Sequence, residues 1–366
     1  MVTRRKVVKS LRITFVLPVT NNLPTGGFKI VYQYANELVH RGHTVTICFT
    51  YSARPEVYRL LNYAGKIKHR LFPRFKNHYR VTWFKIDPRI RLIFDVINRN
   101  ELPNADAVIA TSAPTATFVA HLKKEKGRKY YLIQNSETWW YDDEDELNNT
   151  YRLGLINMAI SQELVEKVYR VSGVKPVYLP DFYNNREFFV SNNVENRSNT
   201  VALLNHTQAS KRTKFGMDVL KDVKKLVPDL KVELFGAYPI ETKLPNYFSY
   251  TYQATPAQLR DEVFGKAKVY LLPSVLEGWG LTGIEAMASG AALVASRIGG
   301  IEDYANDENS LLVAPDDHEG FVSAVTELLK NNSKRISLST KALSLLPLYS
   351  IEASVDKLEK VLETMV

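Results

Sequence analysis

Residues 273–290 read Pro273-Ser274-Val275-Leu276-Glu277-Gly278-Trp279-Gly280-Leu281-Thr282-Gly283-Ile284-Glu285-Ala286-Met287-Ala288-Ser289-Gly290. The apolar run before Pro273 predicts a buried strand, and the glycine-rich stretch predicts a loop that enters a helix near Leu281. Backbone N–H groups left free by the loop and the first helical turn form a site suited to a diphosphate. This order of strand, loop and helix is typical of parallel α/β sheets that bind ligands at the carboxyl ends of their strands.

Two carboxylates, Glu277 and Glu285, flank this predicted anion site. A carboxylate does not bind phosphate, but it accepts hydrogen bonds from hydroxyl groups. A diphosphate between two polyols is a nucleotide sugar, so the pair suits that ligand. On spacing alone, ordinary surface carboxylates in a loop and a helix are the simpler explanation.

Short apolar strands and helices alternate along the whole chain of 366 residues. The pattern predicts two Rossmann-like, doubly wound α/β domains, over residues 1–180 and 181–350, with a ligand cleft between them. An amphipathic helix over 351–366 closes the chain and can pack back on the first domain. The predicted strands are 12–19, 44–50, 107–110 and 130–133, then 201–204, 231–235, 269–272, 292–295 and 310–313.

Positive charge is concentrated in the first third of the chain. Residues 1–130 carry 24 Lys and Arg against 7 Asp and Glu, whereas residues 131–366 carry 24 against 32. Residues 54–99 are the densest part, interleaved with aromatic residues and including Arg70, Arg74 and Lys76. We interpret this segment as a surface for an anionic membrane or a polyprenyl phosphate rather than for nucleic acid, since no nucleic-acid-binding fold is recognisable. A merely solvated basic face is the simplest alternative.

The location of the protein is predicted from what the sequence lacks. One cysteine, Cys48, permits no internal disulfide framework, which favours a reducing compartment. The apolar run after the basic residues at the N-terminus is short and is interpreted as a first buried strand rather than a signal peptide. No uncharged apolar stretch is long enough to cross a bilayer, so we expect a soluble or peripheral protein. Together with the basic surface, this favours a cytoplasmic protein peripheral to the inner membrane face.

The stretch around Glu277 and Glu285 resembles the Glu-x7-Glu signature of the retaining glycosyltransferase family 4, which has the GT-B fold. The resemblance continues through residues 294–304, which carry Gly299-Gly300, and through residues 311–316. It implies that Glu285 holds the ribose hydroxyls, that Glu277 holds a hydroxyl of the donor sugar, and that amides around Gly280, Leu281 and Thr282 hold the diphosphate. It also implies retention of configuration.

The family places a basic pair on the loop after the first strand of its second domain, usually Gly-Arg followed by Lys-Gly. Here the loop reads Asn205-His206-Thr207-Gln208-Ala209-Ser210-Lys211-Arg212-Thr213-Lys214. Aligned at the strand end, His206 falls on the arginine, Lys211 on the lysine and Arg212 on the glycine. Lys211 and the amides near Thr282 are then the expected electrostatic catalysts at the leaving diphosphate, with Lys214 as the competing candidate for Lys211. Glu277 is the second residue expected to act in catalysis. A merely structural His206 is about as plausible as one that contacts the donor.

In the first domain, Pro24-Thr25-Gly26-Gly27 resembles the family loop that borders the donor phosphate, with Gly27 as the contact. A tight strand-to-helix turn is its alternative explanation. Gln134 and Glu137, in Gln134-Asn135-Ser136-Glu137-Thr138-Trp139-Trp140, follow a strand's carboxyl end and are predicted to contact acceptor or donor. A helix-capping role for Glu137 is the alternative. This part looks like a subgroup of bacterial rhamnosyl and surface-polysaccharide transferases.

The sequence therefore predicts a transferase that moves a sugar from a dTDP or UDP donor, with rhamnose as one option, to a glycan or polyprenyl-linked acceptor. Neither a cofactor nor a metal is expected: an Asp-x-Asp motif is absent, and the acidic run 142–146 looks like a solvated loop. Two alternatives share the fold. A nucleotide-sugar 2-epimerase would need no acceptor, and a non-catalytic binding subunit would explain the altered basic loop.

Overall fold

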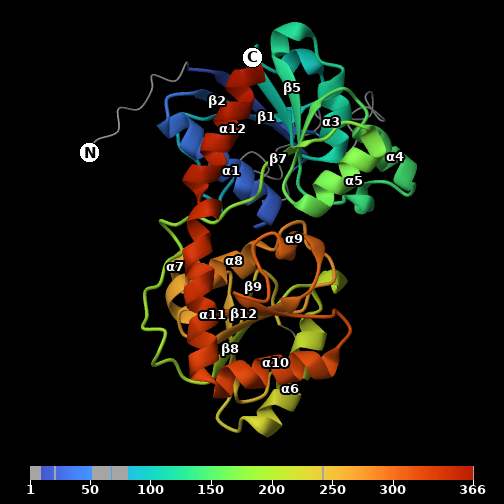
Figure 1. Ribbon diagram of the computed structural model, residues 1–366. Coiled ribbons are helices and arrows are strands. Elements are labelled where there is room, and N and C mark those ends of the chain that lie inside the picture. The colour runs from blue at the N-terminus through green and yellow to red at the C-terminus, as the bar shows by residue number, and fades with distance from the viewer. Residues whose placement is uncertain (1–9, 20–21, 52–66, 68–80, 241–242, 366) are drawn as a thin grey trace. The chain divides into compact units, whose positions relative to one another are not determined.

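The computed structural model describes residues 10–19, 22–51, 67, 81–240 and 243–365 (Figure 1). The chain divides into two compact units. The N-terminal unit comprises Met1–Leu179 together with Val355–Val366, and the C-terminal unit comprises Pro180–Ser354. Each unit is an α/β layer structure around one parallel sheet, as predicted. The expected cleft depends on how the units are placed relative to each other and stays a prediction.

The N-terminal unit contains a sheet of seven strands in the order β3-β2-β1-β4-β5-β6-β7, and every neighbouring pair is parallel. The order reverses between β1 and β4, where the ligand site of a doubly wound fold lies. The strands are β1 Arg12–Leu17, β2 Thr44–Thr50, β3 Arg91–Val96, β4 Ala107–Ala110, β5 Arg128–Ile133, β6 Ile156–Ala159 and β7 Val177–Tyr178. The helices are α1 Gly26–His40, α3 Ala113–Ala120, α4 Glu144–Thr150 and α5 Gln162–Ser172, with 3₁₀ turns η2 Arg99–Glu101, η3 Lys124–Lys126 and η4 Thr138–Trp140.

The C-terminal unit contains six parallel strands in the order β10-β9-β8-β11-β12-β13. They are β8 Thr200–Leu204, β9 Lys231–Gly236, β10 Phe248–Tyr252, β11 Val269–Leu272, β12 Ala292–Ser296 and β13 Ser310–Val313. The helices are α6 Thr213–Leu226, α7 Pro256–Gln258, α8 Leu281–Ala288, α9 Gly299–Glu302, α10 His318–Lys330 and α11 Asn332–Leu345, with η5 Ala209–Lys211, η6 Leu259–Phe264 and η7 Leu346–Tyr349. Helices α6 and α10 lie side by side (Figure 1). Aliphatic residues from these helices and the central strands form one buried core.

The last helix, α12 (Ile351–Met365), belongs to the N-terminal unit from Val355 onward. Arg41, just after α1, donates to Glu359 on α12 (2.6 Å), and Nε2 of His43 lies 2.9 Å from the same carboxylate. Since the Leu11 N–H donates to Nδ1 of His43, the imidazole donates to Glu359 through Nε2. These contacts tie α12 to α1 and to the start of β2.

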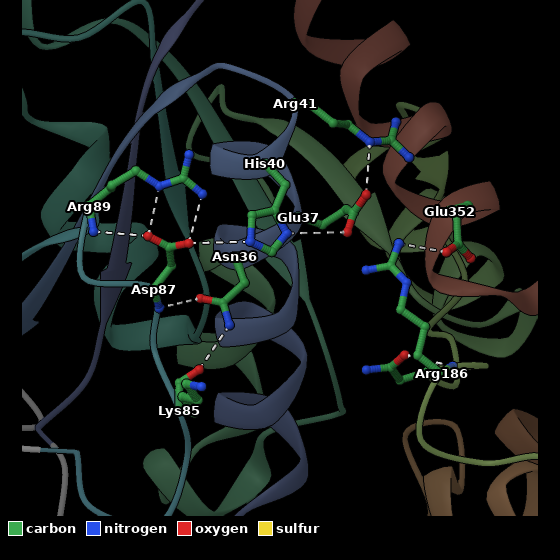
Figure 2. Close-up of polar contacts among 10 residues, drawn as sticks. Asn36, Glu37, His40, Arg41, Lys85, Asp87, Arg89, Arg186 and Glu352 are labelled. Atoms are coloured by element: carbon green, nitrogen blue, oxygen red, sulfur yellow. Dashed lines mark hydrogen bonds and ion pairs between the residues drawn. The ribbon is translucent and has the colours of Figure 1, made fainter.

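A second polar network fastens residues 85–89 to the same helix, α1 (Figure 2). The side chain of Asn36 donates to the carbonyl of Lys85 and accepts from the Asp87 N–H. Arg89 makes paired hydrogen bonds to Asp87 and lowers the pKa of that carboxyl, while Nε2 of His40 lies 3.2 Å from Oδ2 of Asp87. Edge strand β3 is thus reached through a segment anchored on α1.

Three features concern the predicted location and surface. No helix among the described residues is long and apolar enough to cross a bilayer. Cys48 lies buried in β2, where burial raises the pKa of its thiol to about 12. The predicted acceptor or membrane surface at Arg70, Arg74 and Lys76 lies outside the described residues.

One local prediction is wrong. The acidic run at 142–146 is not a loop throughout, because α4 begins at Glu144 and Asp143 caps it by accepting from the Asp145 N–H (2.9 Å). Carboxylates in the first turn are favourable beside the positive end of the helix dipole. The run is solvent-exposed, as predicted.

Candidate active site in the C-terminal unit

The glycine-rich loop between β11 and α8 has the geometry that its sequence predicts. Gly280 adopts a left-handed conformation (φ +82°) and is the N-cap of α8, which begins at Leu281. Glycine adopts this conformation without the steric penalty of a Cβ. The hydroxyl of Tyr304 donates to the carbonyl of Gly280 (2.8 Å), and that of Tyr270 donates to Oγ1 of Thr282 (2.8 Å). Two buried tyrosines therefore hold the first turn of α8 in place.

The other glycines of this region permit close packing. A Cβ at Gly283 would lie 2.2 Å from the Tyr304 hydroxyl, and one at Gly300 would lie 2.3 Å from the carbonyl of Gly278. Gly299-Gly300 at the start of α9 thus packs directly on the glycine-rich loop. Larger residues would push the loop away from the helix N-terminus, where the diphosphate is expected.

Glu277 and Lys211 meet in an ion pair. Nζ of Lys211 lies 2.7 Å from Oε2 of Glu277, and the two side chains are 20% and 8% exposed. A backbone hydrogen bond from the Val275 N–H to the carbonyl of Ser210 (2.8 Å) brings the two loops together. The two residues predicted to act at the donor sugar and the leaving diphosphate therefore touch each other.

The loop that carries Lys211 is wound tightly around His206 and Thr213. The backbone N–H of His206 donates to Oγ1 of Thr213 (3.0 Å), and the Gln208 N–H donates to Nδ1 of His206 (2.9 Å). Burial, and after it the nearby charge of Lys211, lowers the pKa of His206, so the ring is neutral near pH 7. Because Nδ1 accepts, the proton sits on Nε2. His206 offers a donated hydrogen bond where the resembling family has a cationic arginine.

Arg212 stands where the family has glycine, and it adopts the left-handed conformation that favours glycine (φ +53°). Its guanidinium stacks on the ring of Phe215, 3.9 Å from the centroid, donates to the carbonyl of Pro315 and pairs with Asp316. These contacts direct its charge toward the loop after β13.

The predicted donor residues of this unit gather at the carboxyl ends of β8 and β11. Glu285 is on α8 and only 4% exposed, one turn into the helix. Lys214, the alternative to Lys211, is exposed in the first turn of α6. The geometry places Lys211 rather than Lys214 against Glu277, and the roles of all these residues toward a ligand stay predictions.

In the N-terminal unit, Gly27, Gln134 and Glu137 lie at the carboxyl ends of β1 and β5. A Cβ at Gly27 would lie 3.2 Å from Oε1 of Gln134, so the glycine permits a close approach of α1 to that side chain. The amide of Gln134 donates to the carbonyl of Thr111, which follows β4 (3.1 Å). Oε2 of Glu137 accepts from the Ala113 N–H in the first turn of α3 (2.6 Å). The structure therefore brings all three residues around the loop that enters α3.

Burial raises the pKa of Glu137 to about 8, and the hydrogen bond from Ala113 opposes this in part. The carboxyl is 6% exposed and caps another element, α3, rather than its own turn η4. The capping alternative is thus correct in a non-local form. A contact between Glu137 and a substrate stays a prediction.

Sequence reasoning missed the buried aromatic residues that support the site. Trp279 is 1% exposed and packs on Tyr304 and Tyr349 (centroids 4.9 and 5.5 Å apart). Trp279 stands within the decisive stretch, so its size was a signal for burial under the loop. Tyr270 and Tyr304 carry no local signal, because their partners are distant in sequence.

The arrangement of possible metal ligands also bears on the site. Among the described residues, no three His, Cys, Asp or Glu side chains gather closely enough to hold a metal ion. The absence of a cofactor and of a metal stays a prediction.

The match to a known protein family lies in the C-terminal unit. Residues 199–331 match the family model described as Glycosyl transferases group 1. This part of the chain is therefore similar to group 1 glycosyltransferases. The D-inositol 3-phosphate glycosyltransferase of Corynebacterium urealyticum is 33% identical over 97 residues, which cover 26% of this chain and 23% of that protein. The chain thus aligns with only about a quarter of the length of the curated relatives it matches.

Solved structures match over nearly the whole chain. Sucrose-phosphate synthase of Thermosynechococcus elongatus has a TM-score of 0.74 at 16% identity, covering 97% of this chain and 98% of that one. HepE of Anabaena, solved with UDP and glucose, has a TM-score of 0.72 at 12% identity, covering 97% and 100%. At these identities the likeness shows the fold, which is the predicted GT-B fold with two Rossmann-like units.

Proposed function

We propose that the protein is a glycosyltransferase that moves a sugar from a nucleotide-sugar donor to a hydroxyl group of an acceptor. The observation that carries the proposal is the ion pair of Lys211 and Glu277 beside the glycine-bounded N-terminus of α8. Both residues lie within the part of the chain that matches the group 1 glycosyltransferase model, which supports the proposal. A cation, free amides and a carboxylate adjoin there, as a diphosphate bonded to a sugar requires.

In the proposed reaction, the bond between the sugar's anomeric carbon and the diphosphate oxygen breaks, and its electron pair stays on that oxygen. The acceptor oxygen bonds to the anomeric carbon, and its proton passes to the departing phosphate. Lys211 and the amides of Leu281 and Thr282 stabilise the charge that develops on the diphosphate. Glu277 and Glu285 position the sugar and the ribose, and retention follows from the resemblance to family 4.

The donor is proposed to be a UDP or dTDP sugar, with rhamnose among the candidates. UDP is bound by the HepE structure that shares the fold, which supports the uridine option. The acceptor is proposed to be a glycan or a polyprenyl-linked glycan of a bacterial surface polysaccharide, reached at the cytoplasmic membrane face.

An assay of nucleoside diphosphate release tests the activity. Purified protein is incubated with UDP-glucose, UDP-N-acetylglucosamine or dTDP-rhamnose, each with and without a lipid-linked glycan extract. We expect release that depends on the acceptor for one donor, and a loss of about a hundredfold in kcat for Lys211→Ala, against little change for the exposed control Lys214→Ala. Conversion of a donor to its 2-epimer without acceptor would contradict the proposal.

The membrane-facing part of the proposal has its own test. Basic residues near an anionic surface contribute about 1 kcal/mol each, so the protein should sediment with vesicles that contain phosphatidylglycerol. Replacement of Arg70, Arg74 and Lys76 together by Ala should weaken sedimentation. If the wild-type protein and the triple variant sediment equally, the proposed membrane surface is wrong, and the proposed transfer reaction is unaffected.

A further inference from the structure

Trp139 is a large aromatic side chain that stays exposed at the edge of the N-terminal unit. It is 54% exposed and lies on η4, the turn that follows the carboxyl end of β5. Among the described residues, its ring has no aromatic or cationic partner. Single exposed apolar residues are common on protein surfaces, so exposure alone indicates nothing. Trp139 differs from such residues because the turn that carries it is firmly anchored.

The turn that carries Trp139 is anchored from two sides. Glu137, immediately before η4, is buried and accepts from the Ala113 N–H of α3 (2.6 Å). Nζ of Lys167, on α5, donates to Oγ of Ser136 (2.6 Å) and to Glu144 of α4 (3.1 Å). Backbone hydrogen bonds within the turn, from Thr138 to Ser136 and from Trp140 to Glu137, complete the support.

An exposed ring on an anchored turn binds ligands efficiently, because little conformational entropy is lost when it makes contact. The C–H groups on one face of a pyranose carry partial positive charge, and they pack on the negative face of an indole ring. Gln134, which lies 3.2 Å from where a Cβ at Gly27 would stand, comes five residues before Trp139 on the same strand-to-turn connection. Trp139 therefore follows the carboxyl end of β5 on the same connection as Gln134 and Glu137, the residues predicted to contact substrate.

The exposed carboxylates that follow Trp139 in sequence bear on which sugars it can bind. Asp142 and Asp143 are exposed and follow Trp139 by three and four residues, so the Cα of Asp142 lies within about 11 Å of that of Trp139. Carboxylates accept hydrogen bonds from sugar hydroxyls and repel phosphate and carboxylate groups. The surroundings thus favour a neutral or amino sugar over a phosphorylated or acidic one.

We propose that Trp139 is a stacking platform for a pyranose ring of a neutral or amino glycan, which would be the acceptor. The identification of this glycan as the acceptor rests on the proposed function. Binding of the glycan to Trp139 does not, because it needs no catalysis. Glu137 acts as a positioning residue that holds the turn against α3.

Saturation-transfer NMR tests the platform, with the methyl glycosides of glucose, galactose, glucosamine, N-acetylglucosamine and rhamnose as probes. We expect at least one glycoside to bind the wild-type protein, Trp139→Ala to weaken it about tenfold, and Trp139→Phe to retain most of the affinity. Tyr169→Ala, on α5 and 53% exposed, is the matched control and should bind as the wild type does.

Failure of the platform and failure of the proposed function give different results. The platform is overturned when no glycoside binds the wild-type protein, or when binding survives Trp139→Ala unchanged. UDP binding, measured by calorimetry on the same proteins, should be unaffected by Trp139→Ala. If the wild-type protein does not bind UDP but still binds a glycoside through Trp139, the proposed transferase function is overturned and the proposed sugar site at Trp139 stands.

Discussion

Arg212 stores local strain next to the candidate phosphate site. A non-glycine residue in the left-handed region costs roughly 1–2 kcal/mol, and the contacts of Arg212 with Phe215 and Pro315 offset that cost. Both Arg212→Gly and Arg212→Ala remove these contacts, but only glycine also removes the strain. We expect Arg212→Gly to be more stable than Arg212→Ala by about 1 kcal/mol in urea denaturation. The opposite order would show that the left-handed conformation is not kept in solution.

Glu137 makes stability depend on pH. Its pKa rises from 4.5 to about 8 on folding, so the folded protein holds a proton that the unfolded chain releases. This contribution to stability is fully present below pH 4.5 and is lost as pH rises through about 8. Asp181, whose pKa burial also raises to about 8, acts in the same direction.

Glu137→Gln should therefore flatten the fall in stability between pH 5 and pH 8. The change should amount to a few kcal/mol at most, since one unit of pKa shift corresponds to about 1.4 kcal/mol. Urea denaturation at several pH values measures it, and the amide can still accept from the Ala113 N–H. Identical slopes for the variant and the wild-type protein would contradict the burial of an uncharged carboxyl.

For single residues, the sequence predicted several side chains of the candidate site but not which of them contact one another. Glu277, Glu285 and the helix start at Leu281 follow from the glycine-rich stretch, since their chemistry is local. The choice between Lys211 and Lys214 depends on η5, where a hydrogen bond from Val275 to Ser210 aligns two loops. The contact of Glu137 with α3 joins residues 24 positions apart, which no local pattern indicates.

Among the elements, α8 and the glycine-rich loop before it need glycines that leave room for neighbouring side chains, as well as glycines that adopt a left-handed conformation. Gly283→Ala would place a Cβ 2.2 Å from the Tyr304 hydroxyl and should destabilise the C-terminal unit by about 1–3 kcal/mol. Tyr304→Phe removes that hydroxyl, so the double variant should be more stable than the sum of the single changes predicts. Thermal denaturation of the four proteins measures the coupling. Strict additivity would contradict this packing.

The central strands were predictable because they are short, continuous apolar runs buried on both faces. The pattern did not predict β3, β6, β7 and β10. Of these, β3, β7 and β10 are edge strands: β3 and β10 have side chains that are largely half-buried or exposed, and β7 has only two residues. Strand β6 is interior and largely buried, but it is only four residues long and Asn157 interrupts its apolar run. Edge strands need less apolar surface, so their sequences resemble those of loops.

At the scale of the whole molecule, α12 returns the end of the chain to the N-terminal unit. Glu359 accepts from both Arg41 and His43, and Gln at this position has only one acceptor oxygen. Glu359→Gln should weaken the docking of α12 by about 1–3 kcal/mol. Amide hydrogen exchange of α12 measures this docking without assuming two-state unfolding. Glu363→Gln, on the exposed side of α12, is the control and should leave exchange unchanged.

The central claim is that the C-terminal unit binds a nucleoside diphosphate, with the ribose on Glu285 and the sugar on Glu277. Calorimetric titration with UDP, and with dTDP as the alternative, tests it most directly. Glu285→Gln should weaken binding at least tenfold, since a hydrogen bond to a charged group contributes about 1.5–3 kcal/mol. Glu277→Gln should spare or strengthen binding, because it releases Lys211 from its ion pair. Equal losses in both variants, or no nucleotide binding by the wild-type protein, would contradict the account.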